Sequence, residues 1–485
     1  MKDHDIEASW ATEPLFYEAP CPPGQEPRQY QHASVEYCLA RDHALIGDAP
    51  GLGKTIELLM LSNAIEAKRI LVVCPASLRL NWEREVWRWS MLPNVRTYPV
   101  LKAQDGVSPE ANYLIISYDM LRNKNILQAL LDLRWDHLIL DEAHYLKDPK
   151  GNKRTAAICA EDGLRSVAGR ITMASGTILP NQPIECYNAI RLLDWSAIDY
   201  MSVEGFRDYF YEKGQGFVTG RYETTLKNGE TVMKYGPHWS DEVRNVPCNL
   251  DQLRTILRGD IMVRRLKEDV LKELPEKQWH VFPLAASKEV RKAMADDSWG
   301  KVEKLYELDT GAFDEGIPID GAISTAFRLL GEATAPSIAD YIEDLFDSGI
   351  EKLVVGAWHI SVLDYLKERL TKYGVAYIDG NTSPKKKQAQ VDLFQEDIDT
   401  RIILGQVLPL GEGWTLTAAQ DVVQAEPWWV PGKNDQLLER THRIGQEGDR
   451  VLGHMPFVPG TLHEKIISQA VAKDKNIYET LDVRD

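Results

Sequence analysis

The 485-residue sequence has few cysteines, and their spacing fits neither a zinc module nor a disulfide framework. All six lie within the first 250 residues and none forms a CxxC pair: Cys21, Cys38, Cys74, Cys159, Cys186 and Cys248. We therefore exclude a disulfide-rich secreted scaffold, and we expect a reducing compartment.

The sequence also lacks long apolar runs and an excess of basic residues. No stretch approaches the ~18 apolar residues of a membrane span, and the acidic start MKDHDIEASW has no apolar core of a signal peptide. We therefore expect a cytoplasmic protein without a membrane partner. The net charge of −17, from 73 acidic and 56 basic side chains, argues against a nucleic-acid binder that works by charge alone. A local basic track is still compatible with it.

Short apolar runs alternate with helix-like stretches in two separate parts of the chain. This alternation is the β-α-β pattern of a parallel, doubly wound sheet, so we predict an α/β protein with two parallel-sheet lobes in tandem. The predicted strands of the first part are Ala44–Gly47, Ile70–Cys74, Tyr113–Ser117, Leu138–Leu140 and Ile171–Ala174. Those of the second part are Leu353–Ala357, Ala376–Asp379, Ile402–Gly405, Asp421–Gln424 and Val451–Pro456.

The segments outside the two blocks have weaker patterns. A proline-rich start predicts an extended lead-in, and a glycine- and tyrosine-rich stretch predicts an insertion with a hairpin around Asn228-Gly229. An acidic patch from Asp296 to Asp320 predicts a solvated connection within a largely helical region. The predicted division is a lead-in (1–27), a first lobe (28–203), an insertion (204–260), a helical inter-lobe region (261–345) and a second lobe (346–485).

A glycine-rich turn between an apolar run and a helix predicts a phosphate-binding loop. In the string GDAPGLGKT, Gly51 and Gly53 precede Lys54 and Thr55. Glycines let backbone N–H groups curl around phosphate oxygens, and the following helix N-terminus adds positive potential. Lys54 is long enough to reach the β- and γ-phosphates, and the Thr55 hydroxyl is suited to ligate Mg²⁺. Asp48 stands where the strict GxxxxGK[ST] pattern has glycine, which leaves a chance turn open for this string alone.

An acidic pair follows the apolar run of HLILDEAHYLK. Asp141 is suited to hold Mg²⁺ through water, and Glu142 is suited to polarise an attacking water as general base. A solvated Asp-Glu pair is a common alternative at a strand end. Its place about 90 residues after the glycine loop favours a P-loop ATPase that binds ATP and Mg²⁺.

Two arginines near the C-terminus are spaced to share one helix face. In QLLERTHRIGQ, Arg440 and Arg443 are three residues apart, so both guanidinium groups can face a γ-phosphate across a cleft. An ordinary charged surface helix would have the same spacing, but the string with Ile444-Gly445-Gln446 is more specific.

The order of these strings resembles the Swi/Snf-type DNA translocases of helicase superfamily two, and most closely their HepA-related annealing-helicase branch. The resemblance covers roughly residues 28–475. Further strings that carry it are RQYQ (28–31), LVVCPASLRLNWERE (71–85), IISYDML (115–121), DEAHYLKDPKGNKR (141–154), ASGTILPNQPIECYN (174–188), IMVRRLKEDVLKELPEK (261–277), VVGAWHISVLDYL (354–366), DGNTSPKKKQAQVDLFQ (379–395) and WWVPGKNDQLLERTHRIGQ (428–446). The string at 261–277 is among the most family-specific, and the family carries it between the lobes.

The resemblance implies two RecA-like lobes that bind ATP and Mg²⁺ between them, and a monomeric, DNA-dependent ATPase that moves along double-stranded DNA. It implies arginine fingers at Arg440 and Arg443 and a positioning role for His442. The implied ATP-contacting residues are Gln31, Asp48, Gly51, Leu52, Gly53, Lys54, Thr55, Gly413 and Gln436. The implied DNA-facing residues are Ser77, Tyr118, Trp414 and Thr415. Lys385–Lys387 form a basic run that is more typical of a solvated helix start than of a phosphate contact.

Two strings depart from the family pattern. Ile178 and Pro180 replace the usual Pro and Gln of motif III, and Trp414 and Thr415 replace the usual Leu and Asn of motif V. Motif V couples DNA contact to hydrolysis in the family, so the departure bears on coupling. Two alternatives therefore stay open: a strand-separating helicase on RNA or DNA, and a non-catalytic DNA-binding remnant.

Overall fold

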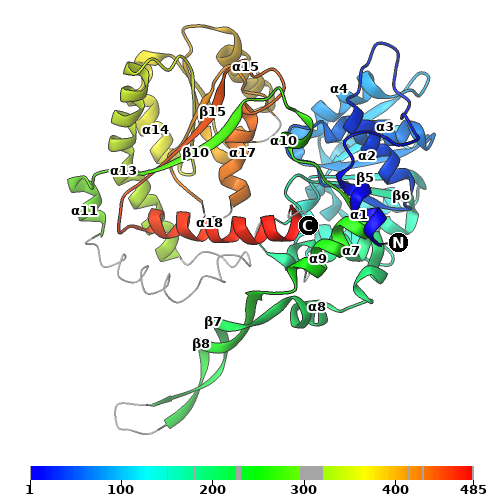
Figure 1. Ribbon diagram of the computed structural model, residues 1–485, viewed down its shortest axis with the longest axis horizontal. Coiled ribbons are helices and arrows are strands. Elements are labelled where there is room, and N and C mark those ends of the chain that lie inside the picture. The colour runs from blue at the N-terminus through cyan, green and yellow to red at the C-terminus, as the bar shows by residue number, and fades with distance from the viewer. Residues whose placement is uncertain are drawn as a thin grey trace.

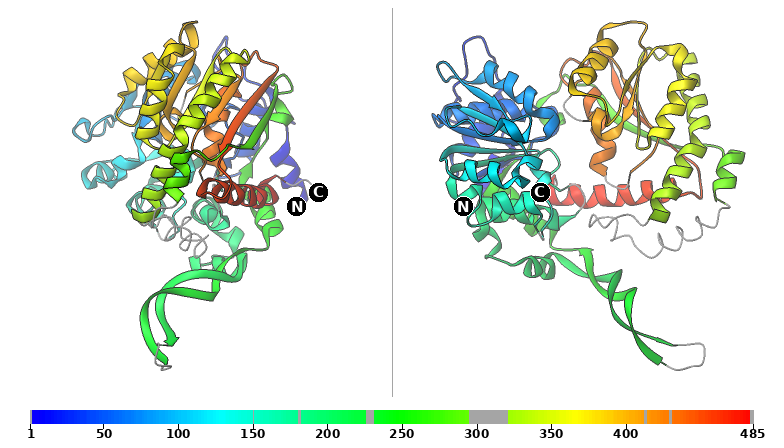
Figure 2. Two further views of the ribbon diagram at one scale, coloured as in Figure 1. Left: turned by 90° about the vertical axis from the view of Figure 1, so that its left-hand side faces the viewer. Right: turned by 180° about the vertical axis from the view of Figure 1, so that it is seen from behind.

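Two parallel β-sheets build two lobes that lie side by side (Figure 1). The computed structural model describes residues 2–149, 151–179, 182–225, 231–294, 321–411, 414–428 and 431–482. Helices pack against the faces of each sheet, and a long two-stranded hairpin projects from the first lobe (Figure 2). The predicted α/β class with two parallel-sheet lobes in tandem is confirmed.

The sheet of the first lobe contains all five strands predicted from the apolar runs. Its seven described strands are parallel and lie in the order β3 (Thr97–Pro99), β4 (Tyr113–Ser117), β2 (Ile70–Cys74), β5 (Trp135–Asp141), β6 (Ala168–Ala174), β1 (Ala44–Ile46) and β9 (Met262–Val263). The two short edge strands, β3 and β9, were not predicted. The phosphate loop follows β1 and the acidic pair ends β5, so both lie at the carboxyl edge of the sheet.

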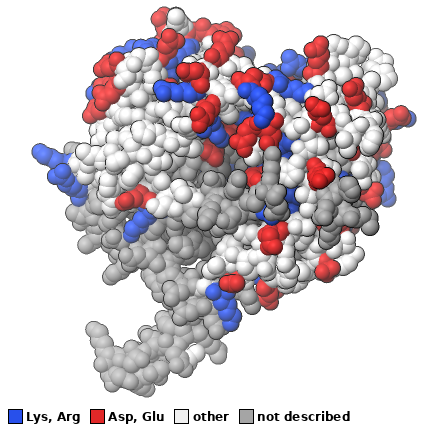
Figure 3. Space-filling view, in the orientation of Figure 1, with Lys and Arg blue, Asp and Glu red and all other residues white. Residues whose placement is uncertain are grey.

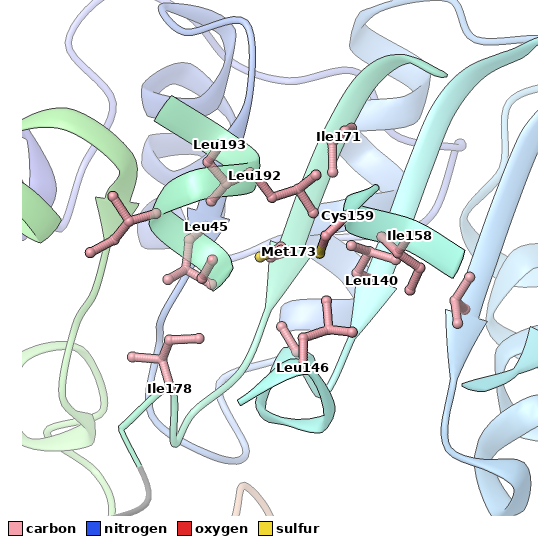
Figure 4. Packing of buried hydrophobic residues seen from close by; sticks show 14 of the residues in the cluster. Leu45, Leu140, Leu146, Ile158, Cys159, Ile171, Met173, Ile178, Leu192 and Leu193 are labelled. Carbon is pink, nitrogen blue, oxygen red and sulfur yellow. The ribbon is translucent and has the colours of Figure 1, made fainter. Parts of the chain in front are cut away.

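Alternate side chains of these strands enter two separate cores. In β2, Leu71 and Val73 belong to one buried cluster, whereas Ile70 and Val72 belong to the other, as the two-residue repeat of a strand requires. All four are fully buried, which is typical of parallel strands covered on both faces. Figure 4 shows part of the first cluster, where β5, β6 and α6 (Lys153–Cys159) bring their side chains together.

Among the described residues, the sheet of the second lobe has six parallel strands. Their order is β10 (Glu276–Pro283), β15 (Arg450–Phe457), β14 (Asp421–Gln424), β11 (Leu353–Ala357), β13 (Ile402–Gln406) and β12 (Val375–Ile378). The five predicted strands are present. The edge strand β10 was not predicted, and it lies within the region 261–345 that was predicted to be largely helical. Its eight residues pair with β15 through the whole strand, so the chain enters the second sheet well before residue 346.

The helices follow the strands in the predicted alternation. In the first lobe they are α1 (Lys2–Trp10), α2 (Gln29–Leu39), α3 (Lys54–Ala64), α4 (Arg79–Trp89), α5 (Lys124–Leu131), α6, α7 (Tyr187–Asp194), α8 (Val203–Phe210) and α9 (Leu250–Ile256). The later ones are α10 (Lys267–Val270), α11 (Lys288–Met294), α13 (Gly321–Asp347), α14 (Ile360–Arg369), α15 (Pro384–Glu396), α16 (Val407–Gly411), α17 (Pro431–Thr441) and α18 (Leu462–Leu481).

The predicted insertion and lead-in have defined structures. The insertion forms the antiparallel hairpin of β7 (Tyr211–Thr225) and β8 (Thr231–Pro247), which confirms the hairpin. Its predicted turn at Asn228-Gly229 and the acidic patch at 296–320 lie outside the described residues. The lead-in is not wholly extended, because α1 forms within it and packs against the segment Leu257–Ile261.

Both ends of the described chain meet at one buried cluster in the first lobe. Arg258 is fully buried, lies 3.4 Å from the centre of the Trp10 ring, and donates to the backbone oxygen of Leu481 at 2.7 and 2.9 Å. Arg264 binds the Asp482 carboxylate through Nε at 2.8 Å and Nη2 at 2.9 Å. Helix α18 therefore leaves the second lobe and docks its last turn in the first (Figure 1).

The surface agrees with the acidic composition. Asp and Glu are spread over the upper parts of both lobes in Figure 3, with Lys and Arg interspersed among them. Within the described part of the chain, we find no helix with the length and apolar character needed to span a bilayer.

Replacing Asp482 with alanine should destabilise the first lobe by about 3 kcal/mol, because it leaves two buried guanidinium groups without their carboxylate. Urea unfolding followed by circular dichroism measures this change. Glu110→Ala is the control, since Glu110 and its partner Arg96 are both largely exposed. Equal stability of the two variants would contradict the docking of α18.

Candidate active site

A cleft of about 780 Å³ lies between the lobes and collects most of the predicted ATP site. The first lobe contributes Gly51, Gly53, Lys54, Thr55, Asp141 and Glu142 to its lining. The second lobe contributes Gln436, Arg440 and Arg443, all on or just after α17. The two lobes thus bring together residues that are about 390 positions apart in the sequence.

The phosphate loop depends on two glycines with left-handed backbone. Gly51 has φ 89° and Gly53 has φ 85°, a region that side-chain-bearing residues rarely adopt. Gly53 precedes the first residue of α3, so the N-terminus of this helix opens towards the cleft. Lys54 Nζ donates to the backbone oxygens of Asp48 at 2.7 Å and Ala49 at 3.2 Å, which folds the ammonium group over the loop.

Three of the residues predicted to contact ATP are not part of the cleft lining: Gln31, Asp48 and Leu52. Gln31 Nε2 donates to the backbone oxygen of Leu52 at 3.1 Å. A Cβ on Gly53 would lie 2.5 Å from the same nitrogen atom of Gln31. The glutamine side chain therefore packs against the loop and supports it. The Leu52 side chain is fully buried. Asp48 is also fully buried, and its carboxylate pairs with Arg265 at 2.5 Å. The Asp48 side chain is therefore turned away from the cleft, which corrects its prediction as an ATP contact.

The acidic pair is held in position by hydrogen bonds from four groups. Asp141 Oδ2 accepts from Trp82 Nε1 at 2.7 Å, and Oδ1 accepts from the Glu142 backbone N–H at 2.9 Å. Glu142 has a left-handed backbone with φ 52°, and its Oε2 lies 3.2 Å from His144 Nδ1. Tyr118 donates to the backbone oxygen of Asp141 at 2.9 Å.

The two carboxylates have opposite tendencies to bind protons. Burial raises the pKa of Asp141, and the neighbouring charge of Glu142 raises it further. Burial also acts to raise the pKa of Glu142, but the hydrogen bond and charge of His144, with the charges of Lys54 and Arg440, hold this pKa below its usual range. Glu142 is therefore a carboxylate at neutral pH, as a general base must be. Arg440 and Glu142 both line the cleft, one from each lobe.

The C-terminal end of α17, which carries Arg440 and is followed by Arg443 (the arginine helix), faces the phosphate loop. A Cβ on Gly51 would lie 3.3 Å from Arg443 Cγ, so this arginine rests against the loop. Its Nε donates to the backbone oxygen of Glu439 at 3.2 Å, and its Nη1 donates to Thr415 Oγ1 at 3.2 Å. Gln436 packs against Gly411, and its buried Oε1 has no hydrogen-bond partner among the described residues. The predicted neighbour Gly413 lies outside the described residues.

The donor groups present fit Mg²⁺ bound chiefly by phosphate oxygens and water. Thr55 and Asp141 both line the cleft, and each Asp141 oxygen accepts one hydrogen bond, which leaves a further lone pair. No cluster of three or more His, Cys, Asp or Glu that would hold a metal without a substrate occurs among the described residues. One carboxylate with one hydroxyl is the pattern in which Mg²⁺ arrives with nucleotide phosphates.

Two of the residues predicted to face DNA pack against the protein interior instead. Tyr118 is 1% exposed, stacks on Tyr145 with ring centres 5.0 Å apart, and holds the end of β5, so it cannot touch DNA in this conformation. Trp414 packs against the core of the second lobe, and its Nε1 donates to the backbone oxygen of Pro409 at 3.2 Å. Thr415 contacts Arg443. Ser77 is half-buried at the turn before α4.

Several residues of this site were not predicted from the sequence. Arg264, Arg265, Lys267 and Glu439 lie around the cleft or just behind the loop, although no role was assigned to them. The family-specific string at 261–277 was a signal for the first three. Trp428, in the string at 428–446, stacks on Trp358 with ring centres 4.0 Å apart. Its neighbour Trp429 lies outside the described residues.

Comparison with known families identifies the parts of this site. Residues 30–318 match the SNF2-related domain, and residues 338–445 match the helicase conserved C-terminal domain. The chain belongs to the SNF2-related family. It is therefore a helicase-like enzyme that uses ATP, and the predicted Swi/Snf-type relationship is confirmed.

This SNF2-related chain is similar to longer curated proteins. It is 30% identical over 472 residues to the SWI/SNF-related matrix-associated actin-dependent regulator of chromatin subfamily A-like protein 1 of Xenopus tropicalis, which covers 94% of this chain and 46% of that protein. It is 28% identical over 429 residues to the DNA annealing helicase and endonuclease ZRANB3 of Mus musculus, covering 86% of this chain and 37% of that protein. The chain thus spans less than half the length of these relatives.

Solved structures of the Sulfolobus solfataricus SWI2/SNF2 ATPase core also align with the SNF2-related chain. The core in complex with dsDNA has 18% identity and a TM-score of 0.42, with 95% of this chain and 98% of that chain covered. The core domain alone has 19% identity and a TM-score of 0.41, with coverages of 97% and 96%.

Alanine at Lys54 and alanine at Arg440 should have different effects on this SNF2-related ATPase. Lys54→Ala should weaken ATP binding by about 10- to 100-fold, because a charge-assisted phosphate contact is lost. Arg440→Ala should lower kcat by about 10³-fold and leave ATP affinity within about threefold, as an arginine that acts mainly on the transition state does. Equilibrium binding of a fluorescent ATP and steady-state hydrolysis separate the two. Lys385→Ala, at an exposed position on α15, is the control. Identical defects at Lys54 and Arg440 would contradict the assignment.

Tyr118→Phe tests the corrected position of this tyrosine. The variant should lose about 1 kcal/mol of stability, because a buried backbone oxygen loses its donor. Its affinity for labelled duplex DNA should stay within about twofold of wild type, measured by fluorescence anisotropy. A loss of DNA affinity without a loss of stability would restore the original prediction.

Proposed function

We propose that the chain is a DNA-stimulated ATPase that moves along double-stranded DNA. The observation that carries the proposal is the inter-lobe cleft, in which the Lys54 loop of one lobe faces Arg440 and Arg443 of the other. Two-lobed ATPases whose site is completed only by lobe closure convert hydrolysis into relative motion of the lobes.

In this proposal the nucleotide lies between the loop and α17. Backbone N–H groups around Gly51 and Gly53 surround the phosphates, and Lys54 moves from the loop carbonyls to a phosphate oxygen. Mg²⁺ held by Thr55 and Asp141 would neutralise phosphate charge. Gln31 acts from behind the loop by fixing Leu52, and Gln436 offers its buried Oε1 from the second lobe.

Hydrolysis is assigned to water attack on the γ-phosphorus. Glu142 accepts the proton of the attacking water as the new P–O bond forms, and the bond to the β–γ bridging oxygen breaks, releasing ADP and phosphate. The guanidinium groups of Arg440 and Arg443 balance the negative charge of the γ-phosphoryl oxygens in the transition state. His144 keeps Glu142 aimed at the cleft through its 3.2 Å contact.

Movement along DNA is the finer part of the proposal. It is supported by the order of the motifs, and by the relative whose printed name is DNA annealing helicase and endonuclease. DNA bound across both lobes would favour closure and so stimulate hydrolysis. Contacts would be made chiefly to phosphates, so binding would be salt-sensitive and weakly sequence-dependent. Ser77 and Thr415 remain the candidate DNA-facing residues, with Arg443 linking Thr415 to the arginine site.

The proposed division of labour follows the predicted parts of the chain. The first lobe (28–203) supplies the phosphate loop, the second (346–485) supplies the arginines, and the insertion (204–260) projects as a hairpin. We expect a monomeric motor, because both halves of the site come from one chain.

Duplex DNA should stimulate hydrolysis at least about tenfold more than single-stranded DNA or RNA of equal length, because the proposed track is a duplex. Phosphate release measured with each nucleic acid decides this. The largest stimulation by RNA would instead support a strand-separating RNA helicase. No hydrolysis with any nucleic acid would support a non-catalytic binder.

A triplex-displacement assay with ATP should then report movement, since it detects travel along a duplex without strand separation. Glu142→Gln should bind ATP and displace nothing, because the general base is lost. Displacement by this variant at the wild-type rate would contradict the proposal.

A further inference from the structure

The segment from Arg264 to Lys267 contacts both the phosphate loop and the arginine helix. None of its residues belongs to the phosphate loop, the acidic pair or the arginine pair. Arg264 Nη1 donates to the backbone oxygens of Gly47 at 2.7 Å and Gly176 at 3.1 Å, at the carboxyl ends of β1 and β6. Arg265 binds the carboxylate of Asp48, at the start of the loop. Lys267, only two residues later, contacts α17 of the second lobe. Three cations of one short segment thus have partners in both lobes.

The ammonium group of Lys267 has three hydrogen-bond acceptors at the end of α17. Its Nζ donates to Glu439 Oε2 at 2.5 Å, to the backbone oxygen of His442, and to His442 Nδ1 at 3.4 Å. His442 Nε2 lies 2.9 Å from the backbone oxygen of Pro275, so Nε2 carries the proton and Nδ1 is the acceptor. An ammonium group has three protons, and all three are directed to this helix end.

The same lysine lies against the phosphate loop. A Cβ on Gly51 would lie 3.4 Å from both Cε and Nζ of Lys267, beside the position 3.3 Å from Arg443 Cγ. Arg443 is in turn fixed to the helix by its bond to the backbone oxygen of Glu439. Lys267 therefore sets the distance between the loop and the segment just after α17 that carries Arg443.

Opposite charges stabilise the contact between Lys267 and Glu439. Burial lowers the pKa of Lys267, while the charge of Glu439 raises it. Burial acts to raise the pKa of Glu439. The positive charges of Lys277, at 2.6 Å, and of Lys267 outweigh this effect and lower the pKa of Glu439 to about 2. A buried ion pair is maintained only when its hydrogen bonds are satisfied, and here the shared carboxylate has two cations.

We propose that Lys267 is a positioning residue for ATP hydrolysis, which places Arg443 at the phosphate loop when the lobes close. This inference rests on the proposed function as an ATPase. Lys267 does not need to touch the nucleotide, because its protons are used by α17. Lys267 affects the reaction by fixing the position of Arg443 relative to the phosphate loop.

Lys267→Met tests the proposal with little disturbance of the buried charges, since Glu439 keeps Lys277 as its partner. We expect kcat to fall about 10²-fold, as a displacement of about 1 Å at a reacting group causes. The dissociation constant of a fluorescent ATP should stay within about threefold. Lys277→Met is the matched control, because it removes the other, more exposed cation of Glu439 and should change kcat by less than about threefold.

A double variant separates positioning from a general loss of structure. If Lys267 acts through Arg443, Lys267→Met with Arg443→Ala should hydrolyse ATP no more than about threefold slower than Arg443→Ala alone. A further 10²-fold loss in the double variant, or a wild-type kcat in Lys267→Met, would overturn the proposal. If Lys267→Met lacks a cooperative melting transition, Lys267→Arg replaces it. The planar guanidinium cannot direct three protons from one point, so kcat should still fall about tenfold at unchanged ATP affinity, and a wild-type rate would overturn the proposal.

The proposed function fails separately from this inference. A wild-type chain without hydrolysis on any nucleic acid would remove the ATPase assignment. An active wild-type chain whose Lys267→Met variant is equally active would remove only the positioning role.

Discussion

Positive charge that is shared across the inter-lobe cleft is the constraint on which this molecule depends. A triphosphate requires cations on both sides, yet cations that line a buried cleft must have partners before the nucleotide arrives. The chain meets both needs with exchangeable contacts. Lys54 binds the carbonyls of its own loop, and Glu439 neutralises Lys267 beside Gly51. The cleft is thus kept ready for phosphate without leaving either ammonium group unpaired.

The same principle explains how the termini contribute to the site. Arg264 binds the backbone behind the phosphate loop with one nitrogen and Asp482 with the other two. Because Asp482 follows α18, the last helix of the second lobe is connected to the loop of the first. Together with Lys267, this gives the lobes two separate links through which closure can be transmitted.

Much of the fold and of the phosphate site could be predicted from the sequence, because their signals are local. Short apolar runs predict β2, β4 and β14 to the residue, and the glycine-rich string before Lys54 and Thr55 predicts the loop. Side-chain direction is not local. Tyr118 and Asp48 are in the expected motifs, but both are buried and serve the acidic strand end and Arg265. Edge strands such as β10 depend on pairing with a distant strand, and Glu439 gains its role only when Lys267 is brought to it.

The central claim is that both lobes contact the bound nucleotide at the same time. A structure of the chain with Mg²⁺, ADP and a phosphate transition-state mimic, determined with duplex DNA bound, tests this most directly. The account predicts the mimic between Lys54 Nζ and the guanidinium groups of Arg440 and Arg443, all within hydrogen-bond distance. A mimic bound to the Lys54 loop while both arginines remain out of reach would contradict it.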